Sequence, residues 1–310
     1  MRILVTGGAG FIGANLVRRL NMHEPDWDVC VLDDLSTGSE ANLEGVTAAF
    51  IHGSVADRDA VAAAVSGADA VVHLAALGSV PRSVNDPIAS HVANLTGTLN
   101  VLEGARTQGA HVIFASSSSV YGSNPALPKS EFDWTRPLSP YAATKLGAEA
   151  YTIAYQKSYG LPTLAFRFFN VYGPLQAADH AYAAVVPRFV SAALSGDPLV
   201  VHSDGRQSRD FTFVDTVTET LHRAIADRVV SEHPVNLAFG TNTTLLELID
   251  VLEDELGERL RVEHVEARAG DVRASQSDGV RIRELFPAVE PVGLREGVAA
   301  TVEWFRQERR

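Results

Sequence analysis

The sequence predicts an α/β fold built on a doubly wound parallel sheet, followed by a smaller mixed α/β C-terminal domain. Three observations predict it. Short apolar segments rich in Val, Ile and Leu alternate with helix-like segments through the first 170 residues. A glycine-rich turn joins the first apolar segment to the first helix-like one. After residue 170 this alternation loosens and prolines interrupt it.

The apolar segments of the first part are short and continuous, which is typical of parallel strands buried on both faces. They are Arg2–Val5, Asp28–Leu32, Ala48–His52, Ala70–Leu74, Val112–Ser116 and Thr163–Phe168. Four helix-like segments follow strands among them: Phe11–Leu20, Arg58–Val65, Ile88–Ala105 and Ser139–Tyr159. Such alternation predicts βαβ units with right-handed crossovers.

The second part contains four further helix-like segments at Val186–Leu194, Val214–Ala226, Leu245–Leu256 and Glu296–Gln307. We therefore place a first domain at residues 1–170 and a second at residues 171–310, and we expect the second to pack closely on the first.

Composition excludes several classes of protein. The chain has 310 residues and a formal net charge of −12, which argues against a nucleic-acid-binding surface. No apolar run reaches the roughly 18 residues of a membrane span, and the N-terminus does not resemble a signal peptide. The single cysteine, Cys30, excludes an internal disulfide, and we expect a plain core thiol there. No cluster of residues suggests a metal site, and we expect a cytoplasmic protein without a membrane partner.

The glycine-rich turn reads Gly7-Gly8-Ala9-Gly10-Phe11-Ile12-Gly13. After a strand and before a helix, Gly7 permits a tight turn, Gly10 lets the backbone approach a pyrophosphate, and Gly13 lets helix and strand pack closely. Asp33 follows the second strand, about 20 residues beyond Gly13, where a carboxylate binds a ribose diol and repels a 2′-phosphate. This Rossmann pattern predicts a dinucleotide, and NAD rather than NADP.

Tyr141 and Lys145 stand four residues apart on a predicted helix, so both side chains can face one site. A phenol has a pKa near 10, and a nearby ammonium and a cationic nicotinamide would both favour its ionised form. The serines that begin at Ser116 lie at the carboxyl end of a predicted strand, where open α/β sheets place ligands. A hydroxyl there can share a proton with a substrate and the phenolate.

Together these motifs resemble the extended short-chain dehydrogenase/reductase family, and specifically its nucleotide-sugar 4-epimerases. The resemblance covers essentially the whole chain. The matching segments are Thr6–Gly13, Asp33-Asp34-Leu35-Ser36-Thr37-Gly38, His73-Leu74-Ala75-Ala76, the Asn94 segment, and the triad of Ser117, Tyr141 and Lys145.

The resemblance implies that the first domain binds NAD. The implied cofactor-binding residues are Gly7, Gly10, Phe11, Ile12, Gly13, Asp33, Ser36, Gly38, Ser54, Val55, Leu74, Ala75, Ala76, Asn94, Tyr141 and Lys145. One position departs from the family pattern, because Ser54 stands where an aspartate usually meets the adenine amine. Ser54 can accept that hydrogen bond without a charge.

The second domain is expected to bind mainly the nucleotide sugar. The implied substrate-binding residues are Ser79, Arg82, Ser117, Asn170, Arg188, Arg209, Arg268 and Ser275. Arg209 and Arg268 suit phosphate because a guanidinium presents a planar fork of donors. Ser275 stands where the family has either a bulky tyrosine or a small residue, and a serine leaves room for a C2 acetamido group.

The resemblance implies an epimerase that inverts C4 of a UDP-sugar, of the UDP-GlcNAc or UDP-glucose type, through a transient 4-keto intermediate. Ser117-Ser118-Ser119 lacks the acidic pair of the related 4,6-dehydratases. Three alternatives stay open: a UDP-glucuronate 4-epimerase, in which Arg188 pairs with the sugar carboxylate; a net-redox nucleotide-sugar enzyme; and a non-catalytic NAD-binding regulator. The family also implies a homodimer formed through the segments Ile88–Ala105 and Ser139–Tyr159.

Overall fold

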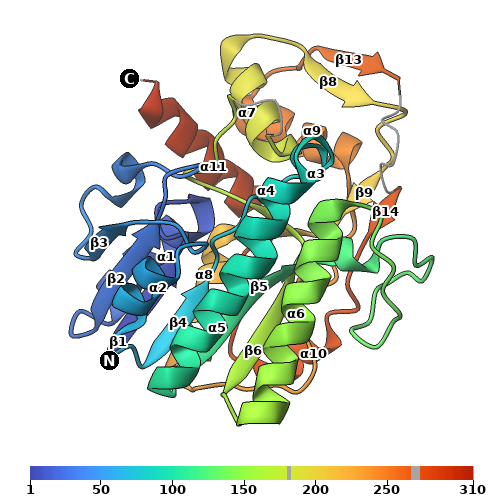
Figure 1. Ribbon diagram of the computed structural model, residues 1–310. Coiled ribbons are helices and arrows are strands. Elements are labelled where there is room, and N and C mark those ends of the chain that lie inside the picture. Colours follow the sequence, from blue (N-terminus) through green and yellow to red (C-terminus); the bar gives the residue numbers. More distant parts are fainter. Residues whose placement is uncertain (180–182, 267–272, 310) are drawn as a thin grey trace. The chain divides into compact units, whose positions relative to one another are not determined.

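A computed structural model of the chain describes residues 1–179, 183–266 and 273–309 (Figure 1). The chain forms two compact units. Unit 1 comprises Met1–Pro125, Glu131–Phe168 and Thr218–Leu237, and unit 2 comprises Ala126–Ser130, Phe169–Val217 and Ala238–Arg310. The chain therefore leaves the first unit after Phe168 and returns to it at Thr218.

Unit 1 is built on a seven-stranded parallel sheet with the strand order β11-β6-β5-β4-β1-β2-β3. Its strands are β1 (Arg2–Thr6), β2 (Asp28–Asp33), β3 (Ala49–His52), β4 (Ala70–His73), β5 (His111–Ser117), β6 (Thr163–Phe168) and β11 (Val235–Leu237). The strand order reverses between β1 and β4, so the predicted doubly wound α/β fold is confirmed. Sequence analysis missed β11 because a strand of three residues, with Asn236 in its centre, gives no periodic signal.

Helices cover both faces of this sheet. One face carries α2 (Arg58–Val65), α5 (Gly97–Gln108) and α6 (Pro140–Tyr159), which pack side by side (Figure 1). α1 (Phe11–His23) joins β1 to β2 in the opposite direction, and a right-handed crossover places it on the other face. There Arg19 forms a 3.5 Å salt bridge to Glu219 of α8 (Val214–Ala226).

The segment 88–105, predicted as one helix, consists of three parts. α4 (Pro87–His91) passes into a π-helical segment at Val92–Thr96, which is followed directly by α5. A single π turn is short and lies between two α-helical segments, so the sequence pattern does not reveal it. The shorter elements of unit 1 are η1 (Glu40–Leu43), α3 (Val80–Asn85) and the 3₁₀ turn η3 (Ser118–Tyr121).

Unit 2 is a mixture of short strands and helices. Its strands pair as β7 (Asn170–Tyr172) with β10 (Phe211–Phe213), β8 (Leu199–His202) with β13 (Val262–Val265), and β9 (Ser208–Arg209) with both β12 (Thr243–Thr244) and β14 (Ala274–Ser275). Its helices are α7 (Val185–Ser195), α9 (Leu245–Leu256), α10 (Val280–Leu285) and α11 (Leu294–Glu308). Unit 2 contains both strands and helices, so the predicted mixed α/β character is confirmed.

Local sequence explains the well-predicted helix ends. The hydroxyl of Thr244 accepts a hydrogen bond from the Glu247 amide while the Glu247 carboxylate bonds back to the Thr244 amide, so α9 begins with a capping box. The helix ends at Gly257, whose φ of +73° suits glycine. In unit 1, Cys30 is buried and free, as expected of a core thiol. Among the described residues, no helix is both long and apolar enough to cross a bilayer.

Candidate active site

The glycine-rich turn carries the chain from β1 into α1. Gly7 has a φ of +71°, and a Cβ at this position would lie 2.6 Å from the backbone nitrogen of Ala75. A Cβ on Gly13 would collide with the Gly7 carbonyl oxygen. No described side chain caps the start of α1 at Gly10, so its first amides stay available for an anion. The turn therefore fits a pyrophosphate that approaches the backbone closely.

Two neighbouring carboxylates lie at the end of β2, where Asp33 is the last residue of the strand and Asp34 follows it. Asp33 accepts hydrogen bonds from the amides of Ala9 and Leu35, each at 2.9 Å, which ties the strand end to the glycine turn. Burial raises the pKa of Asp33, although these bonds oppose the change. Burial also acts to raise the pKa of Asp34, but hydrogen bonds from Ser36 and Ser54 outweigh it, so that pKa is lowered. Ser54, which we expect to meet the adenine amine, therefore also holds Asp34.

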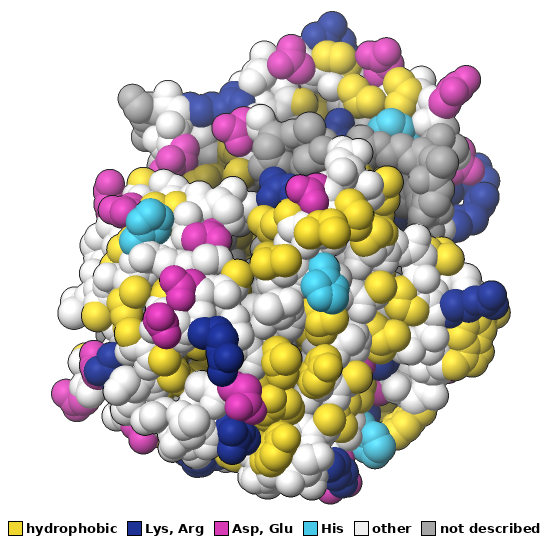
Figure 2. All heavy atoms as spheres, viewed as in Figure 1, with side chains coloured by type: hydrophobic (Ala, Val, Ile, Leu, Met, Phe, Trp, Pro, Cys, Tyr) yellow, Lys and Arg dark blue, Asp and Glu magenta, His cyan; other side chains and the backbone are white. Residues whose placement is uncertain are grey.

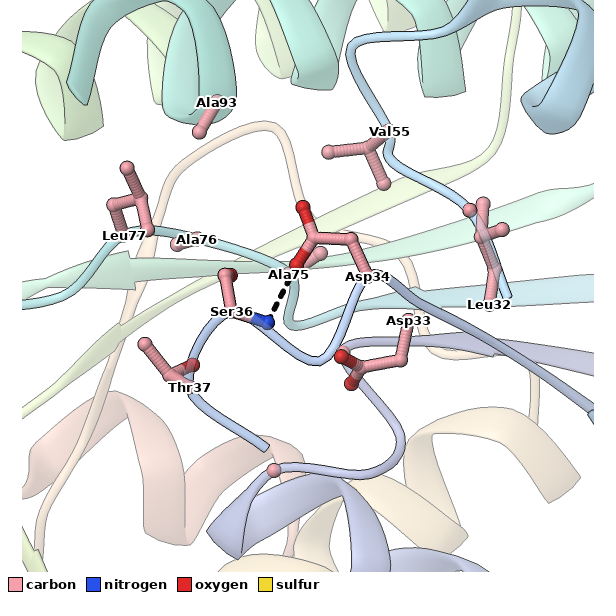
Figure 3. Close-up of a pocket in the computed structure, with 13 residues that line it drawn as sticks. Leu32, Asp33, Asp34, Ser36, Thr37, Val55, Ala75, Ala76, Leu77 and Ala93 are labelled. Atoms are coloured by element: carbon pink, nitrogen blue, oxygen red, sulfur yellow. Dashed lines mark hydrogen bonds between the residues drawn. The ribbon is translucent and has the colours of Figure 1, made fainter. Parts of the chain in front are cut away.

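A cavity of about 150 Å³ opens beside these groups at the carboxyl ends of β1, β2 and β4 (Figure 3). Seven of the predicted cofactor residues line it: Gly7, Gly10, Asp33, Ser36, Val55, Ala75 and Ala76. Six residues that the sequence analysis did not select also line it: Leu32, Asp34, Thr37, Gly53, Leu77 and Ala93. Asp34 and Thr37 had a signal, because both stand in the matching segment 33–38, whereas the other four are apolar or small residues outside it.

The remaining predicted cofactor residues do not line this cavity. Phe11, Ile12 and Gly13 belong to the first turn of α1. Leu74 follows β4, and its amide donates to the Thr6 carbonyl at 3.0 Å. A Cβ on Gly38 would lie 2.7 Å from the backbone of Ala9, so the glycine keeps this segment close to the turn.

The Asn94 side chain is fully committed to protein contacts. Its oxygen accepts from the Leu77 amide at 2.7 Å, and its nitrogen donates to the Leu77 carbonyl at 3.2 Å and to the Thr144 hydroxyl at 3.1 Å. Thr144 precedes Lys145 on α6 and donates to the Tyr141 carbonyl at 2.8 Å. Asn94 therefore links the cavity wall at Leu77 to the helix that carries Tyr141.

His73 is a buried group that the sequence analysis quoted in a motif but did not select. Its Nδ1 lies 2.7 Å from the Thr6 hydroxyl and its Nε2 lies 2.9 Å from the Thr98 hydroxyl. Since Thr98 donates its proton to the Asn94 carbonyl at 2.6 Å, it must accept from His73 Nε2–H. Burial, reinforced by the charge of Lys145, lowers the pKa of His73 to about 3. The ring is thus a neutral link between the ends of β1 and β4 and the first turn of α5.

Ser117, Tyr141 and Lys145 come from the end of β5 and the first turns of α6. The Ser117 and Tyr141 side chains are hydrogen-bonded to each other. Burial raises the pKa of Tyr141, and the bond with Ser117 acts in the opposite direction. Lys145 is buried and donates to the Ala115 carbonyl at 2.8 Å, and burial lowers its pKa to about 8. A phenol, a hydroxyl and an ammonium in this arrangement suit proton transfer.

Two predicted substrate residues of unit 1 lie at the start of α3. Ser79 caps this helix, accepting a hydrogen bond from the Arg82 amide at 3.3 Å. Ser79 has a φ of +102°, a conformation that costs energy for a residue other than glycine. Arg82 is half-buried.

Unit 2 holds most of the other predicted substrate residues. Arg209 of β9 and Ser275 of β14 are directly paired in register, so the structure brings these two together. Asn170 of β7 donates its amide to the carbonyl of Asp210, the neighbour of Arg209, at 3.2 Å. Arg188 lies in the first turns of α7 and is half-buried. Arg268 lies outside the described residues.

Asp210 anchors this cluster, and the sequence analysis did not select it. The side chain is fully buried. It accepts from the amides of Gly240 and Ser277, at 3.0 and 3.1 Å, and from the Thr241 hydroxyl at 2.8 Å. Its burial raises its pKa, against the effect of these bonds.

Comparison with known proteins identifies the family. Residues 3–238 match the model of the NAD dependent epimerase/dehydratase family. The chain belongs to this family. NAD is therefore its cofactor, in agreement with the NAD that the turn and Asp33 predict, and the predicted resemblance is confirmed.

Individual relatives match along their whole length. The chain is 38% identical to a UDP-glucose 4-epimerase of Mycolicibacterium smegmatis, over 99% of each chain. Among solved structures, a UDP-glucose 4-epimerase of Thermotoga maritima with UDP-glucose has a TM-score of 0.94 and 34% identity over 100% of both chains. A UDP-N-acetylglucosamine 4-epimerase of Methanobrevibacter ruminantium, in complex with UDP-N-acetylmuramic acid, has a TM-score of 0.93 and 34% identity over 99% of this chain and 98% of its own.

Proposed function

We propose that this protein is an NAD-dependent UDP-sugar 4-epimerase acting on UDP-N-acetylglucosamine or UDP-glucose. The observation that carries the proposal is the hydrogen-bonded pair of Ser117 and Tyr141 beside the buried Lys145, in a chain of an NAD-dependent family. The relatives that match over the whole chain and are named for inversion at C4 support it.

Unit 1 fits NAD by its own geometry. The cradle at Gly7 and Gly13, which a Cβ would fill, and the uncapped amides of α1 suit the pyrophosphate, while Asp33 and Asp34 suit the adenosine ribose. When bound, NAD supplies a reversible acceptor for the hydrogen on C4, so that the same hydrogen can return to the opposite face of the sugar.

The chain's own residues supply the proton chemistry. Tyr141, as phenolate, takes the proton of the C4 hydroxyl, directly or through Ser117, and gives it back after the keto sugar has turned. Lys145 holds the cofactor ribose and contributes positive charge that favours the phenolate. Arg209, Asn170 and Arg268 hold the diphosphate while the sugar turns about its diphosphate linkage. Fixed donors and charges of this kind accelerate a reaction because they do not need to reorganise.

Other reactions of related enzymes are less well supported. Loss of water from the hexose needs an acid and a base beside Ser117, and Ser118 and Ser119 provide neither. A net-redox enzyme would exchange its cofactor, whereas an epimerase regenerates it in each cycle. A non-catalytic regulator would not require Tyr141 and Lys145.

The sugar class rests on Ser275. Its small side chain stands beside Arg209 in the register of β9 and β14, which leaves room for an acetamido group on a sugar whose diphosphate Arg209 holds. The alternative is a UDP-glucuronate, whose carboxylate would pair with Arg188. Turnover of UDP-glucose, UDP-N-acetylglucosamine and UDP-glucuronate, measured side by side, separates these substrates.

The cofactor state tests the reaction class. An epimerase should carry NAD through purification, so denaturing the protein and assaying the supernatant should yield NAD. Finding NADP there, or a need for stoichiometric NADH, would overturn the proposal.

A homodimer is part of the proposal. Apolar side chains gather over α3, α4 and α6 (Figure 2), and Val84, Ile88 and Tyr151 are 62%, 74% and 44% exposed. Such a contiguous apolar face is typical of a protein interface, and helix pairs from two copies would cover it. Ile88→Lys should convert a dimer to a monomer in sedimentation velocity, and an unchanged sedimentation coefficient would remove this face from the interface.

A further inference from the structure

Ser119 makes two hydrogen bonds to the hydroxyl oxygen of Ser117. Its backbone amide donates to Ser117 Oγ at 3.2 Å, and its own hydroxyl donates to the same atom at 2.9 Å. A serine oxygen has two acceptor positions and one proton to donate. When Tyr141 is ionised, its oxygen can only accept, so Ser117 donates its proton to Tyr141 and both acceptor positions of Ser117 are filled by Ser119.

We propose that Ser119 is a positioning residue, which holds the Ser117 hydroxyl as a hydrogen-bond donor to the Tyr141 oxygen. The inference rests on the proposed epimerase function and deepens it. With its acceptor positions filled, Ser117 cannot accept the proton of the C4 hydroxyl. That O–H bond therefore breaks as a new one forms directly on the Tyr141 oxygen, and Ser117 keeps its own proton throughout.

The local turn does not by itself require a hydroxyl at position 119. Ser117 caps the 3₁₀ turn η3 by accepting the Ser119 amide, a bond that any residue other than proline could supply. The neighbouring Ser118 hydroxyl makes no hydrogen bond to any described residue, although it belongs to the same turn. The bond from the Ser119 hydroxyl is thus additional to the turn, and its direction decides which way the Ser117 proton points.

The position of these groups makes this direction matter. Burial raises the pKa of Tyr141, and the hydrogen bond with Ser117 acts to lower it. A donor that points steadily at the phenolate oxygen stabilises the charged form. If Ser117 could rotate, its proton would spend part of the time on other acceptors and the phenolate would lose that support.

The test titrates Tyr141 in the NAD-loaded protein without sugar, using the ultraviolet absorbance of the phenolate with the Tyr141→Phe protein as the blank. Ser119→Ala should raise the titration midpoint by about 0.5 to 1 pH unit, the size expected from one hydrogen bond. Ser119→Thr, which keeps a hydroxyl, and Ser118→Ala, the matched control, should titrate like the parent. An unmoved midpoint in Ser119→Ala, or a failure of Ser119→Thr to restore it, overturns the proposal.

A kinetic measurement separates this role from substrate binding. With a UDP-sugar that the enzyme epimerises, Ser119→Ala should shift the pH profile of kcat by about 0.5 to 1 pH unit, the same size as the titration shift, and leave KM unchanged. A raised KM with an unmoved profile would make Ser119 a substrate contact and overturn the positioning role. The titration needs no turnover, so its midpoint decides the role of Ser119 whether or not the protein epimerises a sugar. A protein that carries NAD but epimerises none of the tested sugars would contradict the proposed function alone.

Discussion

At the scale of single residues, the ionisation state of Tyr141 is central to the proposed reaction. Burial favours its neutral form, yet the proposed reaction needs the phenolate. The hydrogen bond with the Ser117 hydroxyl acts in the direction of the phenolate. In the proposed reaction, the ammonium of Lys145 adds positive charge on the same helix. Since the pKa of Lys145 is lowered only to about 8, this side chain is charged in most of the protein molecules at pH 7.

Replacing Tyr141 by Phe tests the assignment of the acid–base group. The ring stays and only the oxygen is lost, so turnover should nearly vanish while the Kd for the UDP-sugar, measured by calorimetry, changes little. Ser117→Ala should cost less, on the order of 10²-fold or more. Tyr159→Phe makes the same change at an exposed site 59% accessible on the same helix and should leave turnover unaltered. Turnover of the Tyr141→Phe enzyme at the parent rate would refute the assignment.

A second residue-scale prediction concerns the sugar pocket. Ser275→Tyr should place a ring beside Arg209 and suppress turnover of UDP-N-acetylglucosamine much more than turnover of UDP-glucose. A clash of about 3 kcal/mol with the turning sugar corresponds to on the order of 10²-fold in kcat/KM. Ser275→Ala keeps the pocket open and should preserve the ratio of the two substrates. Equal losses on both would exclude Ser275 from substrate discrimination.

At the scale of elements, a buried carboxylate joins α6 to two strands of the sheet. The Glu149 carboxylate accepts two hydrogen bonds from the Arg167 guanidinium of β6, at 3.0 and 2.7 Å. It accepts a third from the Ser116 hydroxyl of β5, at 2.6 Å. It lies two turns beyond Tyr141 on the same helix. Glu149 therefore sets the position of the helix that carries Tyr141 and Lys145 relative to the strand end that carries Ser117.

Glu149→Gln should destabilise the protein strongly. It leaves the Arg167 guanidinium buried without its counter-charge, which typically costs about 3–5 kcal/mol. The matched control is Glu232→Gln, which breaks an exposed ion pair with Lys157 and should leave stability unchanged. Unfolding by denaturant measures both variants. Equal stability of the two would mean that the buried pair does not anchor α6.

Sequence patterns predicted most of these elements well because their signals are local. α2, α8, α9 and β6 have the predicted bounds, and the Asp57 and Thr244 side chains cap the first turns of α2 and α9. The π-helical segment at Val92–Thr96 was missed. Its residue Asn94 meets Leu77 and Thr144, which are remote in sequence, and local spacing carries no signal for such contacts.

At the scale of the whole molecule, the sequence predicted candidate ligand-binding residues more readily than the residues that hold those candidates in place. Gly7, Asp33 and Tyr141 stand in spacings with a direct chemical meaning, and a family resemblance supported them. His73 and Asp210 matter through partners far along the chain, such as Thr98 and Ser277, which only the fold brings together. Spacing carries no information about such bonds, so the structure was needed to find them.

The buried histidines make the stability of the fold depend on pH. The pKa of His73 is lowered to about 3 by burial and by Lys145, and that of His111 to about 4 by burial, from an ordinary value near 6.5 in the unfolded chain. Below pH 6.5 the unfolded chain binds protons that the native protein does not, so unfolding becomes more favourable. The stabilisation is fully present above pH 6.5 and is lost as the pH falls toward these lowered values.

His73 alone should account for about 1.4 kcal/mol of lost stability for each pH unit below 6.5. The free energy of unfolding is measured by denaturant titration between pH 6.5 and 4.5. It should fall less steeply with decreasing pH in His73→Gln than in the parent protein, because the variant lacks the one proton that His73 binds on unfolding. Gln keeps a donor and an acceptor for the two threonines but cannot titrate. His264→Gln removes an exposed histidine and should retain the parent slope. If His73→Gln also retains the parent slope, the imidazole is protonated inside the native fold, and the neutral link between Thr6 and Thr98 cannot exist as the structure describes it.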